Sequence, residues 1–154
     1  MKIFKVFQII FSFTKEELSE FEEYVKAPYL CGSRDYSTLL KGIILYRNNI
    51  NRLKEITNED FFQKIYPRKI YSNKTLRNRL TELTVLAKKF IVNKETESDK
   101  ALNNMLLLKG LKKRKLYNIF RSEYEKVNNE EEMTAAKSYN GAEIKMLSAY
   151  VYLE

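Results

Sequence analysis

Five basic residues between positions 68 and 79 have the types and spacing of a candidate site for binding an anionic partner. They are Arg68, Lys69, Lys74, Arg77 and Arg79, in the stretch KIYPRKIYSNKTLRNRL of residues 64–80. Guanidinium and ammonium groups bind phosphates and carboxylates. If a helix begins after Ser72, then Lys74 and Arg77 lie near its start and away from its apolar side, as in a DNA recognition helix. These residues are therefore candidate contacts for nucleic acid or for an acidic partner.

The same segment is also typical of an ordinary joint between two helices. A helix-turn-helix usually joins its helices by about three or four residues, often with a glycine, whereas residues 67–72 make six with no glycine. Arg79 lies at the edge of the apolar stripe, where we expect it to extend along apolar surface or to pair with a carboxylate. We expect Ile70 and Tyr71 to fasten the joint to the core. Nucleic-acid binding is therefore the alternative hypothesis.

The composition excludes several kinds of catalytic site. The chain has no histidine and a single cysteine, Cys31, which removes a histidine triad, a histidine proton shuttle and a His/Cys zinc cluster. Its four glycines are isolated, so neither standard phosphate-binding glycine loop is present. Paired glutamates such as Glu16 and Glu17 suit a helix start. We predict a non-enzymatic protein with no catalytic residue, cofactor, metal or small-molecule ligand.

Composition also predicts the fold class. The 154 residues are 44% hydrophobic and 31% charged, as in a water-soluble globular protein. Only four glycines and two prolines interrupt them, whereas a sheet sandwich needs a turn about every ten residues. No apolar stretch approaches the roughly 20 residues of a membrane span. The sequence therefore predicts an all-α protein without a membrane span, and the lone cysteine suits the cytoplasm.

Positive charge is concentrated in the middle of the chain. The net charge is +8, and residues 31–116 hold 20 basic and 8 acidic residues. This distribution favours an acidic or polyanionic partner. Lysine supplies 20 of the 28 basic residues, and the chain is also rich in asparagine and isoleucine. All three have codons rich in A and T, so genome composition is an alternative source of the charge.

Helix starts and apolar periodicity divide the chain into about seven to eight helices. Thr14 with Glu17, and Thr57 with Asp60, have the spacing of capping boxes. With apolar residues at helical spacing, they predict helices over residues 1–12, 15–27, 34–46, 58–66, 73–93, 101–115, 116–127 and 128–154. The third is expected to fade in the polar run RNNINR, and the last to begin at the acidic NNEEE.

The polar stretch NKETESDK of residues 93–100 is the best candidate boundary. Thr96 and Asp99 are both placed to cap the helix that follows. We therefore predict an N-terminal helical bundle over residues 1–95 and a repeat-like helical hairpin segment over residues 96–154, packed on it. No helix stop precedes Glu154, so we expect either a fragment of a longer repeat protein or a last helix that a partner covers.

Three stretches carry a family resemblance: FSFTKEELSEFEEYVKAPYL, FFQKIYPRKIYSNKTLRNRLTEL and LLLKGLKKRKLYNIF, residues 11–30, 61–83 and 106–120. They resemble the N-terminal part of a family of bacterial all-helical, tetratricopeptide-like proteins with no assigned activity. The sequence departs from the family pattern at Ala27, where serine is expected, and at Arg68, where glycine is usual. The resemblance implies a helical fold and a longer parent chain, and it implies no function.

The leading functional hypothesis is a protein–protein interaction or scaffold module. It would bury apolar helix surface against a partner protein, while the basic middle region steers an acidic partner. The alternative is a nucleic-acid-binding domain that uses Arg68, Lys69, Lys74, Arg77 and Arg79.

Overall fold

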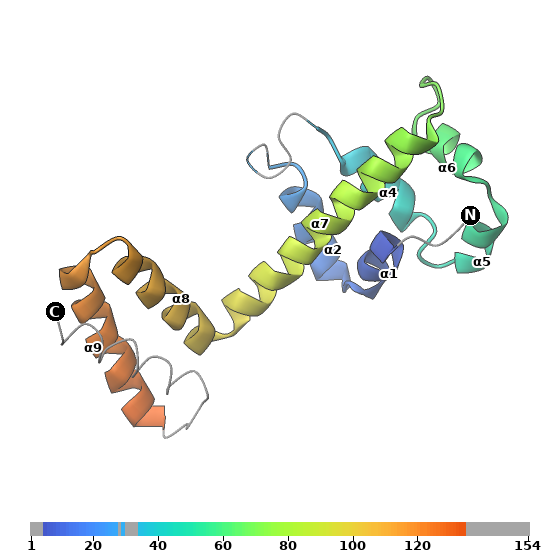
Figure 1. The fold of residues 1–154 in the computed structure, drawn as a ribbon. Coiled ribbons are helices and arrows are strands. Elements are labelled where there is room, and N and C mark those ends of the chain that lie inside the picture. The colour runs from blue at the N-terminus through green and yellow to red at the C-terminus, as the bar shows by residue number, and fades with distance from the viewer. Residues whose placement is uncertain (1–4, 28, 30–33, 135–154) are drawn as a thin grey trace. The chain divides into compact units, whose positions relative to one another are not determined.

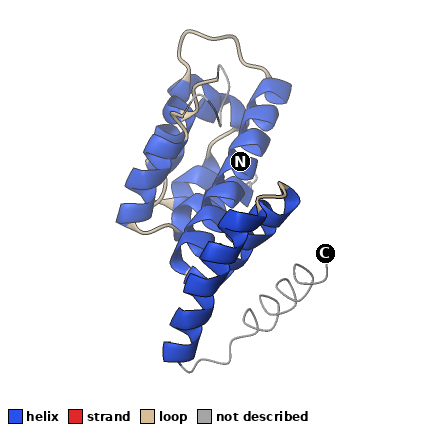
Figure 2. Cartoon of the chain, turned by 90° about the vertical axis from the view of Figure 1, so that its left-hand side faces the viewer, coloured by secondary structure: helices blue, strands red, loops and turns tan. Residues whose placement is uncertain are grey.

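A computed structural model of the chain describes residues 5–27, 29 and 34–134, and all of its regular structure there is helical (Figures 1 and 2). The helices are α1 (Lys5–Ser12), α2 (Lys15–Tyr24), α4 (Ser37–Ile44), α5 (Ile50–Glu55), α6 (Asn58–Ile65), α7 (Asn73–Ser98), α8 (Lys100–Lys113) and α9 (Tyr117–Thr134). The all-α prediction is confirmed. None of the described helices is long and apolar enough to cross a membrane. Cys31 and residues 135–154 of the expected last helix lie outside the described residues.

Both predicted capping boxes are present. The Thr14 hydroxyl oxygen accepts from the Glu17 amide at 3.1 Å, and the Glu17 carboxylate accepts from the Thr14 amide at 2.7 Å. Thr57 and Asp60 make the same reciprocal pair at 3.0 and 3.2 Å. Each box satisfies backbone donors that the first turn of a helix leaves without partners. This local chemistry fixes where α2 and α6 begin.

The chain divides by its internal contacts into one unit of residues 1–92 and another of residues 93–154. Aromatic rings join the helices of the first unit. The ring centroid of Phe7 in α1 lies 5.5 Å from that of Phe61 in α6. The ring centroid of Phe90 in α7 lies 5.2 Å from that of Phe21 in α2 and 5.4 Å from that of Phe13, which lies between α1 and α2. These buried rings hold α1, α2, α6 and α7 around one core.

The second unit contains the hairpin of α8 and α9. Its buried core consists of Met105, Leu108, Phe120 and Val127. The turn has a Schellman motif, because the Leu116 amide donates to the Leu111 carbonyl at 3.1 Å and the Lys115 amide to the Lys112 carbonyl at 2.9 Å. Lys115 has a φ of 58°, a left-handed conformation that glycine adopts more readily.

Replacing Lys115 with glycine is therefore expected to stabilise the hairpin by about 1 kcal/mol, because a side chain in this conformation is strained. Urea unfolding followed by circular dichroism measures the change. Lys113→Gly is the matched control. It places a glycine inside α8 and is expected to destabilise by up to about 1 kcal/mol. Equal effects of the two substitutions would contradict the strain argument.

Several helix boundaries differ from the sequence prediction, including the end of α2 at Tyr24 instead of residue 27. Residues 50–55 form α5, where the expected helix was to fade, because the Asn49 side chain accepts from the Arg52 amide at 3.1 Å and caps it. α7 continues to Ser98 instead of about Asn93, so Thr96 lies inside α7 and Asp99 alone caps α8. α4 begins at Ser37. The acidic run NNEEE lies within α9 and does not begin a helix.

Candidate functional site

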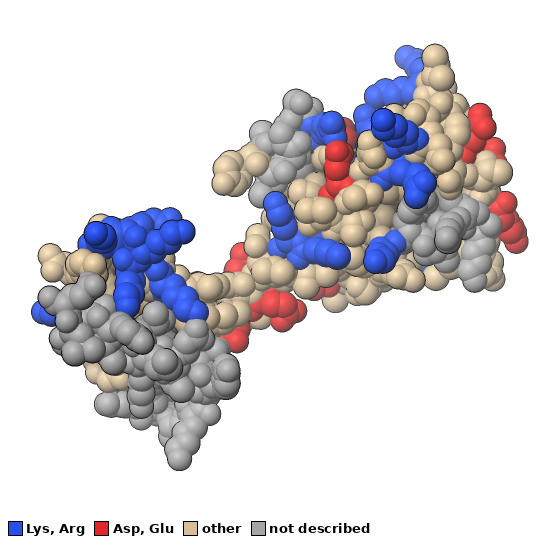
Figure 3. Space-filling model, viewed as in Figure 1, with Lys and Arg blue, Asp and Glu red and all other residues tan. Residues whose placement is uncertain are grey.

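Four of the five predicted basic residues are exposed. Arg68 and Lys69 lie in the loop between α6 and α7, and Lys74 and Arg77 lie on the first two turns of α7. No ion pair in the described part of the chain involves any of the four. Figure 3 shows basic side chains gathered along the face of the first unit that α7 crosses. These four cations are available to an anionic partner.

Arg79 is different, because Tyr66 holds it. Its Nη1 donates to the Tyr66 hydroxyl at 3.1 Å, and its guanidinium carbon lies 5.1 Å from the centre of the Tyr66 ring. Lys69 contacts the same ring, with Nζ 5.3 Å from its centre. Both arrangements are cation–π contacts. The partner of Arg79 is thus a tyrosine where we expected apolar surface or a carboxylate, and its guanidinium is already engaged.

The expectation that Ile70 fastens the joint to the core is wrong. Its side chain is 95% exposed. Tyr71 does fasten the joint, because its ring packs against Phe62 with centroids 5.6 Å apart. On the other side of the loop, the Lys69 amide donates to the Tyr66 carbonyl at 3.0 Å. Pinned at residues on both sides of it, the loop presents Ile70 to solvent.

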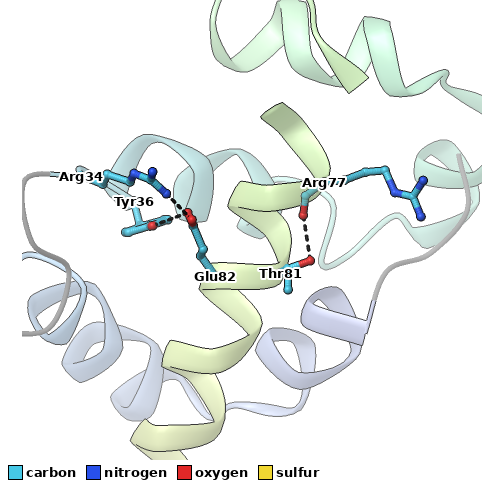
Figure 4. Close-up of polar contacts among 5 residues, drawn as sticks. All are labelled: Arg34, Tyr36, Arg77, Thr81 and Glu82. Carbon is cyan, nitrogen blue, oxygen red and sulfur yellow. Dashed lines mark hydrogen bonds and ion pairs between the residues drawn. The ribbon is translucent and has the colours of Figure 1, made fainter. Parts of the chain in front are cut away.

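Glu82 of α7 is paired with two residues that precede α4. Glu82 is ion-paired with Arg34, and the Tyr36 hydroxyl donates to its Oε2 at 2.6 Å (Figure 4). These contacts, the tyrosine hydrogen bond first, lower the pKa of the Glu82 carboxyl group from 4.5. Arg77 extends away from this cluster in Figure 4. The exposed side of α7 near Arg77 therefore keeps its positive charge.

The lowered pKa of Glu82 predicts a pH-dependent stability. A carboxyl group with a lower pKa in the folded state stabilises the fold above its unfolded pKa of about 4.5, and this contribution disappears as pH falls through the folded value. Glu82→Gln is therefore expected to lower the melting temperature more at pH 7 than at pH 3. Tyr36→Phe, which removes the same hydrogen bond from the other side, should weaken the wild type's pH dependence. An equal Glu82→Gln effect at both pH values would contradict this interpretation.

A groove of about 720 Å³ opens on another part of the first unit, between α4, α5 and α6 with one residue of α2. Its lining includes the apolar side chains of Ile44, Leu45 and Ile65. It also includes three cations and one carboxylate, which are Lys41, Arg52, Lys64 and Glu22. Cations around apolar side chains suit a ligand with both anionic and apolar groups.

Two contacts shape this groove. Gly42 lets α4 approach α6 closely, because a Cβ atom at this position would lie 2.5 Å from Cγ1 of Ile65. Lys64 is held at one side, where its Nζ donates to the Tyr46 hydroxyl at 3.3 Å. The groove is not predictable from the sequence, because its residues come from separate helices. The one local signal was a glycine inside an apolar helical pattern, which often marks a close approach of two helices.

The chain matches no family model, no curated protein and no solved structure. The resemblance to tetratricopeptide-like bacterial proteins therefore stays a prediction. Within the described residues, no group of three or more histidine, cysteine, aspartate or glutamate side chains is placed to hold a metal ion. The groove and the exposed cations are thus the features from which a function can be argued.

Proposed function

We propose that this protein is a non-enzymatic protein-interaction module whose groove holds an acidic, amphipathic segment of a partner protein. The observation that carries the proposal is the union of apolar side chains and three cations in one groove of about 720 Å³. An amphipathic helix docks in such grooves through apolar anchors spaced three or four residues apart. The proposal includes a cytoplasmic location, which the lone cysteine supports.

The apolar part of the groove would supply affinity. Leu45 is 80% exposed, and it lines the groove together with the half-buried Ile44 and Ile65. A leucine that passes from water into an apolar contact contributes about 1.5–3 kcal/mol. An exposed leucine next to two further apolar side chains is therefore a natural anchor point for an apolar residue of the partner.

The charged part would select the partner. Lys41, Arg52 and Lys64 outnumber the one lining carboxylate, Glu22, so the groove favours a segment that carries acidic side chains. Complementary charge raises association rates and suppresses wrong partners more than it raises affinity. A basic partner would meet three like charges, and that repulsion excludes it.

The second unit supports a scaffold class independently. In α8, Met105 and Leu108 are buried, while Leu106 and Leu107 are 45% and 46% exposed. A helix with apolar residues on more than one side is typical of helical repeats, in which each hairpin packs on its neighbours through both sides. This pattern agrees with the repeat-like module that we propose.

Selection from a displayed peptide library tests the proposal with the full chain as bait. We expect enrichment of peptides that combine acidic residues with apolar residues three or four positions apart. Leu45→Ser and the double variant Lys41→Glu/Arg52→Glu should each bind a selected peptide at least about tenfold more weakly. These three side chains are exposed, so the fold should tolerate the changes.

The matched control is Lys88→Glu/Lys89→Glu, which makes the same change in net charge on exposed positions of α7. This variant should keep the wild-type affinity, apart from a modest loss from long-range charge. Peptides that lose equal affinity for the control and the groove variants would reveal non-specific charge attraction. A selection that enriches no acidic amphipathic peptide would also refute the proposal.

Nucleic-acid binding through residues 68–79 is the second candidate. The exposure of Arg68, Lys69, Lys74 and Arg77 without described ion pairs favours it. Titration of duplex DNA and of single-stranded RNA at low and high salt tests it, because phosphate contacts make affinity fall steeply with salt. Lys74→Glu/Arg77→Glu should abolish such binding, and unchanged binding by this variant would remove α7 from the hypothesis.

A further inference from the structure

The loop between α6 and α7 exposes a large aliphatic side chain among cations. Ile70 is 95% exposed, and Arg68 and Lys69 precede it in the same loop. The loop forms one end of the first unit in the view of Figure 1, where it extends beyond α6 and the start of α7. A single exposed aliphatic residue is ordinary on a protein surface. Its place on a projecting basic loop is what calls for an explanation.

The loop is held in a defined shape that keeps Ile70 outside. The Gln63 side chain donates to the Lys69 carbonyl at 3.3 Å, and the Lys69 amide donates to the Tyr66 carbonyl at 3.0 Å. After Ile70, the Tyr71 ring packs against Phe62. Tyr66, before the loop tip, is buried, and Tyr71, after it, is half-buried. Ile70 is exposed because both of its sides are fastened.

The cations near the tip extend onto the next helix. Lys74 and Arg77 are exposed on the first two turns of α7, and the carboxylate of Glu82 is occupied by Arg34 and Tyr36. Arg79 adds positive charge near the base of the loop, although Tyr66 engages it. An approaching anionic surface would therefore meet cations around Ile70, with no described carboxylate paired to Arg68, Lys69, Lys74 or Arg77.

We propose that this loop docks on an anionic lipid surface, with Ile70 inserted at the boundary between headgroups and acyl chains and the surrounding cations on lipid phosphates. An amphipathic element binds a bilayer through buried apolar area together with attraction to anionic lipids. The phosphates of nucleic acid would bind the same cations. A nucleic-acid duplex, however, offers Ile70 an apolar environment only where neighbouring base pairs are unstacked. The exposed aliphatic side chain therefore favours lipid over nucleic acid.

The expected binding is weak, reversible and sensitive to salt. Each basic residue near an anionic bilayer strengthens binding about fivefold, and the insertion of one aliphatic side chain strengthens it about tenfold. For comparison, a single myristoyl chain attached to a protein gives only marginal, reversible membrane binding. The loop would thus recruit the protein to a surface without anchoring it permanently. This proposal uses no residue of the groove, so it stands or falls independently of the proposed function.

Fluorescence of a tryptophan at the loop tip tests insertion directly. The chain has no tryptophan, so Ile70→Trp supplies a single reporter in the full-length protein. With vesicles of phosphatidylcholine and phosphatidylserine at low salt, we expect its emission to shift to shorter wavelength. Vesicles of phosphatidylcholine alone should leave it unchanged. Val92→Trp, at a position 62% exposed on α7, is the matched reporter and should not shift.

Vesicle co-sedimentation with untagged variants measures the two contributions. We expect Ile70→Ser to lower the partition coefficient about tenfold and Arg68→Gln/Lys69→Gln to lower it roughly 30-fold. Lys88→Gln/Lys89→Gln removes the same charge farther along α7 and should have a smaller effect. All of these side chains are exposed, so circular dichroism spectra should match the wild type.

Three results would overturn the proposal. The first is no binding of the wild type to anionic vesicles at low salt. The second is binding that Ile70→Ser does not weaken and that produces no shift in the Ile70→Trp emission, because it would show adsorption by charge alone. The third is a preference for duplex DNA or RNA over anionic vesicles that depends on Arg68 and Lys69, which would assign the loop to nucleic acid.

Discussion

Replacing Phe90 with alanine is expected to destabilise the first unit by about 3–5 kcal/mol, the range for truncation of a buried phenylalanine. Phe90 is only 4% exposed, and its ring lies within 5.5 Å of three other rings, those of Phe13, Phe21 and Tyr24. Its loss would leave a cavity and remove aromatic contacts in the same place. Urea unfolding followed by circular dichroism measures the change.

Val92→Ala is the control for this prediction. Val92 lies two positions after Phe90 on α7, and it is 62% exposed. Shortening its side chain should change the free energy of unfolding by no more than about 0.5 kcal/mol. Phe90→Leu keeps most of the apolar volume and should cost less than the alanine variant. A loss below about 1 kcal/mol for Phe90→Ala would mean that the aromatic cluster does not hold α7 against α2.

The cluster bears on the proposed function because it holds α2, which contributes one residue to the groove. Phe21 and Tyr24 belong to α2, and the neighbouring residue Glu22 lines the groove. When Phe90 is removed, α2 loses a main contact with α7. We therefore expect Phe90→Ala to weaken binding of groove-selected peptides even at temperatures where the protein stays folded.

The structure is predictable from the sequence where it depends on residues close together in the chain. The boxes at Thr14 and Thr57 form between residues three apart, so their spacing alone predicts them. The apolar side of α7 follows from helical periodicity, and the apolar residues at that spacing are buried, namely Leu76, Leu80, Leu83, Leu86, Ala87 and Phe90. Fold class follows because scarce glycine and proline leave few places for turns.

The structure differs from the prediction where it depends on residues distant in the chain or on competing local signals. Ile70 and Tyr71 are adjacent and both apolar, yet only Tyr71 faces a partner, Phe62, which lies in another helix. The polar stretch after Asn93 resembles a break, but nothing in it stops a helix before the Asp99 cap, so α7 continues. Polar composition alone does not end a helix when proline and glycine are absent.

The candidate site was predictable only in its charges. The basic residues could be named from the sequence, but the engagement of Arg79 by Tyr66 depends on how α6 meets α7. The groove could not be named at all, because Lys41, Arg52 and Lys64 come from three different helices. Net charge favours the proposed acidic partner, whereas only the fold indicates where such a partner would bind.

Replacing Gly42 with alanine is expected to destabilise the first unit by about 2 kcal/mol. The new methyl group would lie 2.5 Å from Cγ1 and 2.6 Å from Cδ1 of Ile65, closer than any van der Waals contact allows. Isoleucine is branched at Cβ and cannot easily rotate away. Overpacking of this kind costs about 1–3 kcal/mol and outweighs the gain of up to about 1 kcal/mol from alanine's helix propensity.

Two further variants separate the clash from a general effect of the substitution. Gly110→Ala in α8 should be neutral or stabilising, because its new methyl group would meet only Nη1 of Arg114, at 3.3 Å, and that flexible side chain can move. In an Ile65→Ala background the clashing atoms are gone, so Gly42→Ala should stabilise the protein by its helix propensity. The sign of the Gly42→Ala effect would then invert between the two backgrounds.

The sign inversion is the decisive measurement because it depends on contact between α4 and α6. If Gly42→Ala destabilises equally in both backgrounds, then Ile65 is not the obstacle and the close approach of the two helices is not what requires glycine. If the sign inverts, Gly42 and Ile65 fix the spacing of the two helices that carry Lys41 and Lys64. The Gly42→Ala protein should then also bind groove-selected peptides more weakly, since the displaced Ile65 side chain lines the groove.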